Sequence, residues 1–447
     1  MKKGSEYWVL LITMSLSLLG LLMVFSSSLV MTASSADFGS DPYFFVKRQT
    51  LWFIAGLVAL YFCRKVDLEK WRNFLSLPFL GINMFLLVLV ILVGPEINGA
   101  QRWLVIGGFQ FQPAEFTKLA IIFYTADFLA RRGEKIKSFS RLLPALVLWG
   151  ACVILIEQEP DLGTAMVVAG VFLVLLFASG AELSHLLGMG GAGLLVVVVS
   201  VLAKPYRLKR ITSFLEPDAD PQGSGYHAIQ SLLAIGSGGL TGRGFGVGHQ
   251  KYKYLPEAHT DYIFAILGEE LGLVGTVCVL FLFIAFLYKG CQIALQCRKP
   301  YLRNVALGVT FLICLQALLN IGVVTASTPS TGIPLPFISY GGTSLLFSLI
   351  SVGLLMNVAR NNEAQREATK ISGSTATKHR TGATLSSSHE ESLEAVSTGV
   401  WESRAAGSRL YSSGEKVPRP AVEPGLLKTT DWSSRRRHGS GSKRKSV

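Results

Sequence analysis

Long apolar stretches, separated by short polar loops, repeat along most of the chain. Ten of them approach the roughly 20 residues that a helix needs to cross a bilayer. They cover residues 8–30, 48–63, 76–94, 115–130, 142–157, 162–180, 185–203, 262–288, 305–326 and 343–359. The pattern predicts an all-α polytopic membrane protein, a ten-helix bundle with a large loop between the seventh and eighth spans.

Positive charge divides the loops into two sets. The N-terminus and the loops 64–72, 131–141 and 289–303 hold about fifteen Lys and Arg residues, and the short loops between them hold roughly three. Cytoplasmic loops carry the excess of positive charge, so we expect both termini in the cytoplasm and the alternate loops outside. The first span is too long for a signal peptide and lacks a convincing cleavage site, so we expect it to be retained.

Composition agrees with a membrane protein, since 50% of the residues are hydrophobic and only 16% are charged. A net charge of +13 would suggest nucleic-acid binding in a soluble domain. Here the basic loops account for most of it, and no nucleic-acid partner is expected. The six cysteines form no CxxC pair, which indicates neither a metal site nor a disulfide framework.

The composition changes abruptly after Arg360. Residues 361–447 are rich in Ser, Thr, Gly, Lys, Arg and Glu and show no sustained apolar period. We therefore predict two parts, a membrane domain over 1–360 and a disordered, basic cytoplasmic tail over 361–447. The basic end of the tail suits an anionic membrane surface or an acidic partner, but the simpler interpretation, which we prefer, is a solvated tail.

The outward loop after the third span carries two candidate sites. Arg102 precedes a Trp, a pair that suits an interfacial anchor as well as a charge-binding role. Glu115 and Lys118 lie three residues apart at a helix start, so they share one face and can pair inside the bundle. An intramembrane ion pair is either a functional site or a structural pairing.

The short loop between the fifth and sixth spans gathers three acids, Glu157, Glu159 and Asp161, around Pro160. Proline breaks the first helix, and Asp161 is placed to cap the second. A turn with a cap explains this pattern. Three carboxylates also suit a divalent cation, Mg²⁺ or Mn²⁺, or a substrate amide.

The longest outward loop, about residues 204–261, opens with four basic residues: Lys204, Arg207, Lys209 and Arg210. Positive charge at the outer surface suits a lipid phosphate or pyrophosphate. A short interfacial helix follows from Tyr226, and then a glycine-rich run from Gly236 to Gly248 that contains Arg243. This run either cradles a phosphate through backbone N–H groups or forms a flexible loop.

The loop ends in a polar cluster, Glu257-Ala-His259-Thr260-Asp261, directly before an apolar span. A charged group there must be paired or face water, because its exposure to lipid costs about 2.5–3.5 kcal/mol. Asp261 is our candidate for the chemistry. The alternative is that Thr260 or Asp261 caps the helix that follows.

The last outward loop, 325–343, is rich in Pro, Gly and hydroxyl residues, among them Ser339 and Tyr340. Irregular backbone at membrane depth is tolerated only where it is buried in protein or lines a cavity. We therefore expect this loop to wall the same outward cavity as Asp261.

These motifs together resemble the SEDS family (shape, elongation, division and sporulation) of bacterial membrane proteins over nearly all of residues 8–360. The stretches that carry the resemblance are GAQRW from Gly99, FQPAEF from Phe111, EPDLGT from Glu159, HTDYIF from His259 and PLPFISYGG from Pro334. Residues 43–49 and 258–272 are more similar to the septal, FtsW-like branch than to the elongation, RodA-like branch.

The resemblance implies a peptidoglycan glycosyltransferase that polymerises lipid II into glycan strands at the outer face of the bacterial cytoplasmic membrane, at the division septum. It assigns Asp261 to the acidic residue that polymerisation requires, and a carboxylate in reach of the acceptor hydroxyl is a suitable general base. It also implies a class B penicillin-binding protein, a transpeptidase, and other divisome proteins as partners, besides membrane lipids. By charge alone, Arg102, Arg210 and Arg243 suit the departing pyrophosphate.

The remaining substrate-binding candidates within these motifs are Glu115, Lys118, Glu159, Asp161, His259, Thr260, Ser339 and Tyr340. Two other function classes fit the same pattern: a lipid II flippase, and a divisome scaffold that only recruits the transpeptidase. A flippase needs polar lining reachable from both faces. Here the polar clusters lie at the outward ends of the spans, which favours the enzyme.

Overall fold

The computed structural model describes residues 4–33, 41–97, 99–107, 109–252 and 254–369. The first nine residues of the predicted tail, 361–369, continue the last helix, and the rest of the tail lies outside the described residues. The fold is almost entirely helical. The labelled elements are α1 (Ser5–Ala33), α2 (Phe44–Lys65), α3 (Arg72–Leu75), α4 (Leu77–Val93), β1 (Leu104–Ile106), β2 (Phe109–Phe111), α5 (Pro113–Arg132), η2 (Gly133–Lys137), α6 (Phe139–Gln158), α7 (Leu162–Ala178), α8 (Leu183–Ala203), α9 (Pro205–Leu215), η3 (Pro217–Ala219), α10 (Tyr226–Ser237), α11 (Ile263–Leu295) and α12 (Pro300–Val324). A last helix, Gly342–Thr369, follows α12.

Each predicted span coincides with a helix, so the all-α membrane fold is confirmed. Among the described residues, seven helices are long and apolar enough to cross a membrane: α1, the α3–α4 segment, α6, α8, α11, α12 and the last helix. The other three predicted spans correspond to α7, which is apolar but 17 residues long, and to α2 and α5, which carry several charged residues. The small antiparallel hairpin β1–β2 and the helix α9 were not predicted.

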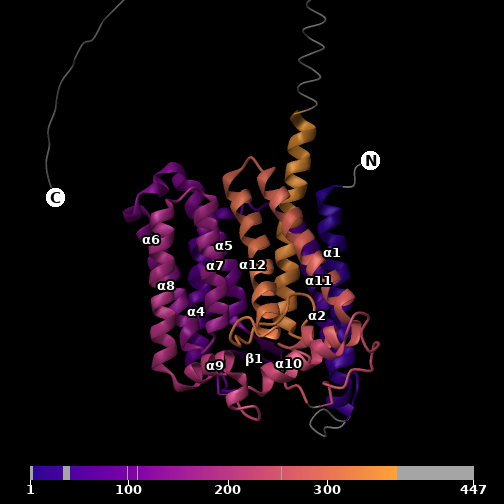
Figure 1. Cartoon of the computed structure of the whole chain (residues 1–447). Helices are drawn as coiled ribbons and strands as arrows, with labels where there is room; N and C mark the ends of the chain where they lie inside the picture. The colour runs from indigo at the N-terminus through magenta and orange to yellow at the C-terminus, as the bar shows by residue number, and fades with distance from the viewer. Residues whose placement is uncertain (1–3, 34–40, 98, 108, 253, 370–447) are drawn as a thin grey trace, which may run out of the picture. The chain divides into compact units, whose positions relative to one another are not determined.

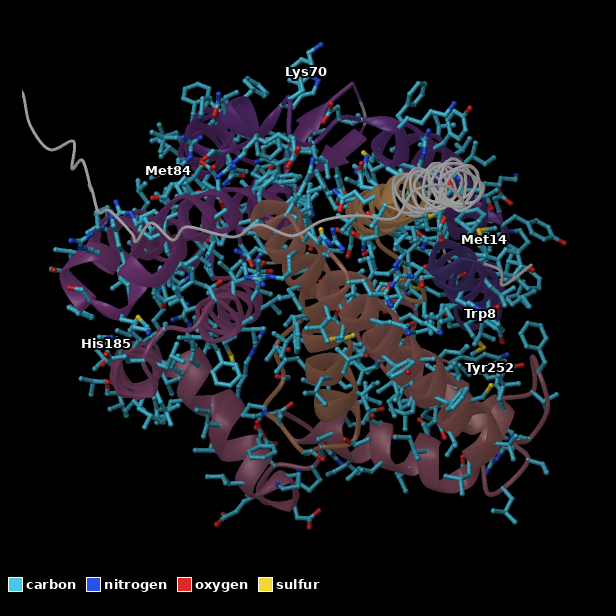
Figure 2. All side chains as sticks on the ribbon, turned by 90° about the horizontal axis from the view of Figure 1, so that it is seen from above. Trp8, Met14, Lys70, Met84, His185 and Tyr252 are labelled. Atoms are coloured by element: carbon cyan, nitrogen blue, oxygen red, sulfur yellow. The ribbon has the colours of Figure 1, made fainter. Side chains whose placement is uncertain are left out.

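Helix α12 lies at the centre of the bundle, against α5, α7 and α11. Its own residues and those of the last helix are largely buried. Helix α8, in contrast, contributes almost nothing to the core, and large apolar side chains such as Leu187 and Leu194 are exposed along it. A contiguous apolar surface of this kind is stable against lipid rather than water. The side chains at the edge of the bundle, including Trp8 and Met84, are seen in Figure 2.

The loops sort to two ends of the bundle, as the charge pattern predicted. Figure 1 shows α9, β1 and α10 gathered at one end, while α1 begins and the last helix ends at the other. Ion pairs at this second end link the basic segments to neighbouring helices and loops, and one further pair lies within α5. These pairs are Arg64–Glu6, Arg72–Asp127, Arg131–Asp127 and Lys299–Glu69.

Helix α11 is broken at Gly272, where φ is +66°. Only glycine adopts this conformation readily, and a Cβ at this position would lie 2.2 Å from the backbone nitrogen of Gly242. The glycine-rich run from Gly236 to Gly248 packs against the break. The N–H groups of Arg243 and Gly244 donate to the carbonyls of Glu269 and Glu270, at 3.0 and 3.1 Å. The run therefore satisfies backbone groups that the interrupted helix cannot pair itself.

Two buried carboxylates complete this region. Glu269 accepts hydrogen bonds from the backbone N–H groups of His249 and Gln250, at 2.7 and 3.1 Å. Glu270 pairs with the ammonium of Lys251 at 2.8 Å, and the hydroxyl of Ser26 donates to it at 2.6 Å. The triad of Ser26, Lys251 and Glu270 is buried, so it ties α1 and the outward loop to the N-terminal half of α11.

Candidate active site

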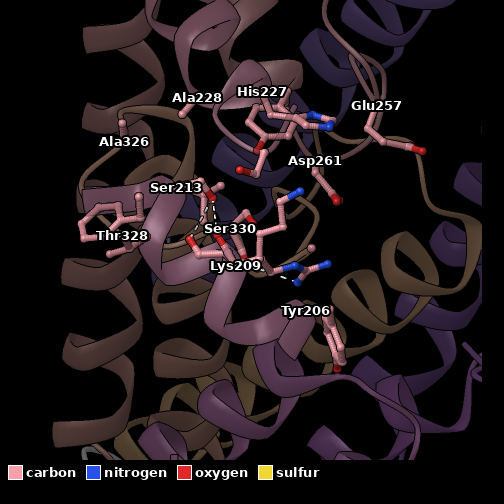
Figure 3. Close-up of a pocket in the computed structure, with 16 residues that line it drawn as sticks. Tyr206, Lys209, Ser213, His227, Ala228, Glu257, Asp261, Ala326, Thr328 and Ser330 are labelled. Atoms are coloured by element: carbon pink, nitrogen blue, oxygen red, sulfur yellow. Dashed lines mark hydrogen bonds between the residues drawn. The ribbon is translucent and has the colours of Figure 1, made fainter. Parts of the chain in front are cut away.

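A cavity of about 320 Å³ opens at the end of the bundle that carries α9 and α10. Figure 3 shows its wall, which combines α9, α10, the turn before α11, the end of α12 and the segment 326–332. The prediction that the last outward loop walls the same cavity as Asp261 is therefore confirmed. The lining residues are Tyr206, Lys209, Arg210, Ser213, Phe214, Ser224, His227, Ala228, Glu257, Asp261, Tyr262, Val323, Ala326, Thr328, Ser330 and Gly332.

A tight turn presents Asp261 to this cavity. The turn starts at Glu257, whose φ is +52° and whose carbonyl accepts the N–H groups of Thr260 and Tyr262 at 3.1 and 3.2 Å. The carboxylate of Glu257 accepts the hydroxyl of Thr260 at 2.7 Å. Thr260 is thus used within the turn, and Asp261 is the residue that the turn directs toward the cavity.

The backbone of this turn is fixed from both sides. Asn320 of α12 donates from one amide nitrogen to the carbonyls of Asp261 and Ile333, at 2.7 and 2.8 Å. The hydroxyl of Ser339 donates to the carbonyl of Thr260 at 2.6 Å. The N–H of Tyr340 donates to the carbonyl of His259 at 2.9 Å. Neighbours distant in sequence therefore hold Asp261 in place.

His259, Ser339 and Tyr340 do not line the cavity themselves. The ring of His259 is buried between Phe45 and Tyr340, with centroid distances of 4.6 and 5.7 Å. Burial lowers the pKa of His259, which favours a neutral imidazole in the aromatic cluster. These residues position the turn that carries Asp261.

The side chain of Asp261 makes no hydrogen bond within the described residues. The N-cap residue of α11 is Tyr262, and no side chain caps this helix. Neither carboxylate oxygen of Asp261 accepts a hydrogen bond from a described residue, so the capping alternative is wrong for this residue. Asp261 is partly exposed toward the cavity, and its burial on the other sides raises its pKa to about 7, helped by the charge of Glu257. A carboxylate with a pKa near the working pH is suited to accept and release protons.

Two arginines lie close enough to Asp261 to act on it electrostatically. The charges of Arg102 and Arg210 both lower its pKa, against the larger effect of burial. Arg210 is exposed in the cavity wall, beside Lys209, and donates to the carbonyl of Ser330 at 3.3 Å. Arg102 is outside the cavity wall and donates to the carbonyls of Glu159 and Pro160. Arg210 and Lys209 are thus the cations that a ligand in the cavity meets.

Arg207, another of the four residues of the basic cluster, has a structural contact instead. It is buried and pairs with Glu157 of α6, close to Ser200 of α8. This pair fastens α9 to the ends of two long helices. Lys209 and Arg210, on the next turn of α9, line the cavity.

The acidic turn between α6 and α7 is a cap, as one interpretation predicted. Asp161 is the N-cap of α7 and accepts the N–H of Thr164 at 3.0 Å. Gln112 adds a hydrogen bond to the same carboxylate at 3.3 Å. Glu159 is fully buried and neither of its carboxylate oxygens has a partner among the described residues. Burial and the charge of Asp161 raise the pKa of Glu159 to about 9, so it keeps its proton at neutral pH.

Glu115 and Lys118 form the predicted ion pair, at 2.6 Å inside α5. Lys118 also donates to Gln316 of α12 at 3.2 Å. Both residues line a second, much smaller cavity, separate from the one that Asp261 faces. Arg243 lies with the glycine-rich run, 3.7 Å from Glu269, and is not part of the larger cavity wall.

Sequence reasoning missed two residues of this site. Asn320 is a polar residue within an apolar span, and such residues are functional candidates, so a signal was present. His227 lies on the interfacial helix α10 and faces the cavity, but neighbouring apolar positions dominated the pattern. Among the described residues, no cluster of three or more His, Cys, Asp and Glu side chains is arranged to hold a metal ion.

Comparison with known proteins agrees with the observed fold. A family model described as "Cell cycle protein", covering FtsW, RodA and SpoVE, matches residues 7–364. The chain belongs to this family. The match includes nearly all of the helical bundle and the cavity at Asp261, which confirms the SEDS resemblance. Together with the apolar helices, it shows that the chain is an integral protein of the cytoplasmic membrane.

Curated FtsW/RodA/SpoVE relatives cover most of the chain. Stage V sporulation protein E of Bacillus subtilis (strain 168) is 45% identical, over 80% of this chain and 98% of that protein. The probable peptidoglycan glycosyltransferase FtsW of Geobacter sp. (strain M18) is 40% identical, over 80% of this chain and 97% of that protein.

Solved structures of the family share the fold. One chain comes from a study of structural coordination of polymerization and crosslinking by a peptidoglycan synthase complex. It superimposes with a TM-score of 0.65 and 32% identity, covering 80% of this chain and 98% of its own. The rod shape determining protein RodA of Thermus thermophilus gives a TM-score of 0.59 and 29% identity, covering 79% and 96%.

Proposed function

We propose that this chain is a peptidoglycan glycosyltransferase that polymerises lipid II, with Asp261 as the general base. The observation that carries the proposal is the free carboxylate of Asp261, held by a rigid turn at a cavity that also contains Arg210 and Lys209. The name of the Geobacter relative, a probable peptidoglycan glycosyltransferase, supports this class of reaction.

The cavity supplies the groups that one direct displacement needs. Asp261 accepts the proton of the acceptor sugar hydroxyl as its oxygen bonds to the anomeric carbon of the donor. The bond from that carbon to the lipid pyrophosphate breaks, and the anomeric carbon is inverted. Arg210 and Lys209 are the exposed cations of the cavity wall that stabilise the negative charge of the leaving pyrophosphate.

The cavity opens to the outer face in this proposal, and both termini are cytoplasmic. The basic loops meet at the opposite end of the bundle, and cytoplasmic loops carry the excess of Lys and Arg. Lipid II and the growing glycan strand then occupy the same side as α9 and α10. Membrane lipids surround the exposed apolar face of helices such as α8.

The polymerase works with a transpeptidase, a class B penicillin-binding protein, and with other proteins of the division septum. The synthase complex that contains a structural relative coordinates polymerization and crosslinking, which supports a crosslinking partner here. A sporulation role is a second candidate, because the Bacillus sporulation protein is 45% identical, above the 40% of the Geobacter FtsW relative. Both roles use the same chemistry.

A flippase and a scaffold are the competing classes. The larger cavity lies at one end of the bundle, and the buried Glu115–Lys118 pair lines a separate small cavity. A transport route needs polar lining that becomes reachable from both faces. The one-ended cavity and its free carboxylate favour the enzyme.

The test is lipid II polymerisation by purified protein, alone and with its transpeptidase, for wild type and Asp261→Asn. Asparagine keeps the shape of the side chain but removes the base, so we expect a loss of about 10²–10⁴-fold in polymerisation rate. The variant should still fold and bind the transpeptidase. Equal polymer from both proteins would exclude Asp261 as the base, and no polymer from either would favour the flippase or scaffold.

A further inference from the structure

His227 is the aromatic residue of α10 that faces the cavity beside Asp261. Its ring stacks on Tyr262, the residue after Asp261, with a centroid distance of 5.6 Å and an interplanar angle of 25°. Figure 3 shows its imidazole on the side of the cavity that carries Glu257 and Asp261. The stack fixes the plane of the ring, so its nitrogens are held at one place in the cavity wall.

Neither nitrogen of this ring has a hydrogen-bond partner in the part of the chain that the structure describes. Nδ1 of His227 is buried without a hydrogen-bond partner, and Nε2 also has none among the described residues. A buried polar atom without a partner costs about 1–3 kcal/mol, so such atoms call for an explanation. Burial lowers the pKa of His227, which leaves a neutral ring with one donor and one acceptor nitrogen.

We propose that His227 is a substrate-binding residue that hydrogen-bonds the sugar whose hydroxyl is presented to Asp261. A sugar offers hydroxyl and amide groups that can donate to or accept from Nε2, the nitrogen of His227 that is not buried. The stack on Tyr262 fixes the ring, so the hydrogen bond forms at one place in the cavity wall. The inference rests on the proposed polymerase function.

His185 provides a matched control. It also has a buried Nδ1 without a described partner and an aromatic neighbour, Phe139, at 5.5 Å. It lies at the start of α8, whereas the other end of α8 leads into α9 at the cavity. The two histidines share their chemistry and differ in access to the cavity.

The experiment measures KM and kcat for lipid II polymerisation, in the presence of the transpeptidase, for wild type, His227→Phe, His227→Gln and His185→Phe. Phenylalanine keeps the stack on Tyr262 and removes both nitrogens. We expect His227→Phe to raise KM at least about fivefold with kcat little changed, because the lost hydrogen bond forms in the ground state and the transition state alike. His227→Gln should restore KM to near the wild-type value, and His185→Phe should leave it unchanged.

A merely structural role for His227 predicts a different result. The melting temperature of His227→Phe would fall, and KM would stay at the wild-type value in the folded fraction. That result, or a His185→Phe variant with an equally raised KM, overturns the inference while wild-type polymerisation still supports the enzyme. Absence of polymer from wild type overturns both.

Discussion

The glycine-rich run and the turn at Asp261 lie within one outward loop, yet the structure uses their polar groups in opposite ways. The N–H groups of Arg243 and Gly244 in the run are paired with α11 around its break, and so are the carboxylates of Glu269 and Glu270 in α11 with the loop that follows the run and with Ser26. In the turn, backbone groups are paired, but the carboxylate of Asp261 lies at a cavity and has no partner among the residues that the structure describes.

This difference separates structural charges from functional ones. A buried charge must be neutralised by a partner or lose its charge. In the triad of Ser26, Lys251 and Glu270, the ammonium of Lys251 neutralises the carboxylate of Glu270. A group that handles protons or substrate must instead keep its bonding capacity unused until the ligand arrives. Asp261 and His227 both line the cavity, and their side chains have no hydrogen-bond partner among the described residues.

The largest expected effect comes from breaking the paired region. Lys251→Met leaves the carboxylate of Glu270 buried without its cation. We expect the free energy of unfolding to fall by about 3–5 kcal/mol, measured by denaturation in detergent. A smaller loss, below about 1 kcal/mol, would mean that the glycine-rich region is not held by its charges.

Lys70→Met is the control for this variant. Lys70 is exposed and its side chain points away from the bundle (Figure 2). Removing its charge should change the free energy of unfolding by no more than about 0.5 kcal/mol. An equal loss in both variants would show that the effect is one of net charge.

A smaller effect distinguishes the two aspartates that precede helices. Asp161→Ala removes the cap of α7, and we expect a loss of about 0.5–2 kcal/mol in the free energy of unfolding. Asp261→Ala removes no cap, so it should not destabilise the protein. In the wild-type protein, folding raises the pKa of Asp261 from 3.8 to about 7, so ionisation of this carboxyl destabilises the folded state increasingly between these pH values. Above pH 7 the alanine variant should therefore melt at a higher temperature than wild type, whereas equal losses for both variants would contradict this distinction.

The sequence predicted the spans, the pairing of Glu115 with Lys118 and the position of Asp261 at a cavity, because each depends on local pattern. It did not separate Asp161 from Asp261, since both precede an apolar helix and both can cap one. Only the turn at Glu257 and the contact from Asn320, 59 residues away in the chain, distinguish them.

The same limit applies to the basic cluster and the glycine-rich run. Arg207 and Arg210 look alike in sequence and lie one turn apart on α9, but Glu157 of α6 is within reach of Arg207 only, and Arg210 lines the cavity. Ser26 is separated from Glu270 by 244 residues, so the buried triad has no local sequence pattern. Long-range packing decides which polar groups remain free.

The most direct test of the account is the pH dependence of kcat/KM for polymerisation, in wild type and in His227→Gln. If Asp261 is the base, kcat/KM falls about tenfold per pH unit below its pKa of about 7 and is constant above it. The glutamine variant should keep this acid limb, because the group that titrates is Asp261 and not His227. A profile that is flat between about pH 5 and 8 in wild type, or an acid limb that disappears in His227→Gln, would contradict the assignment of Asp261 as the general base.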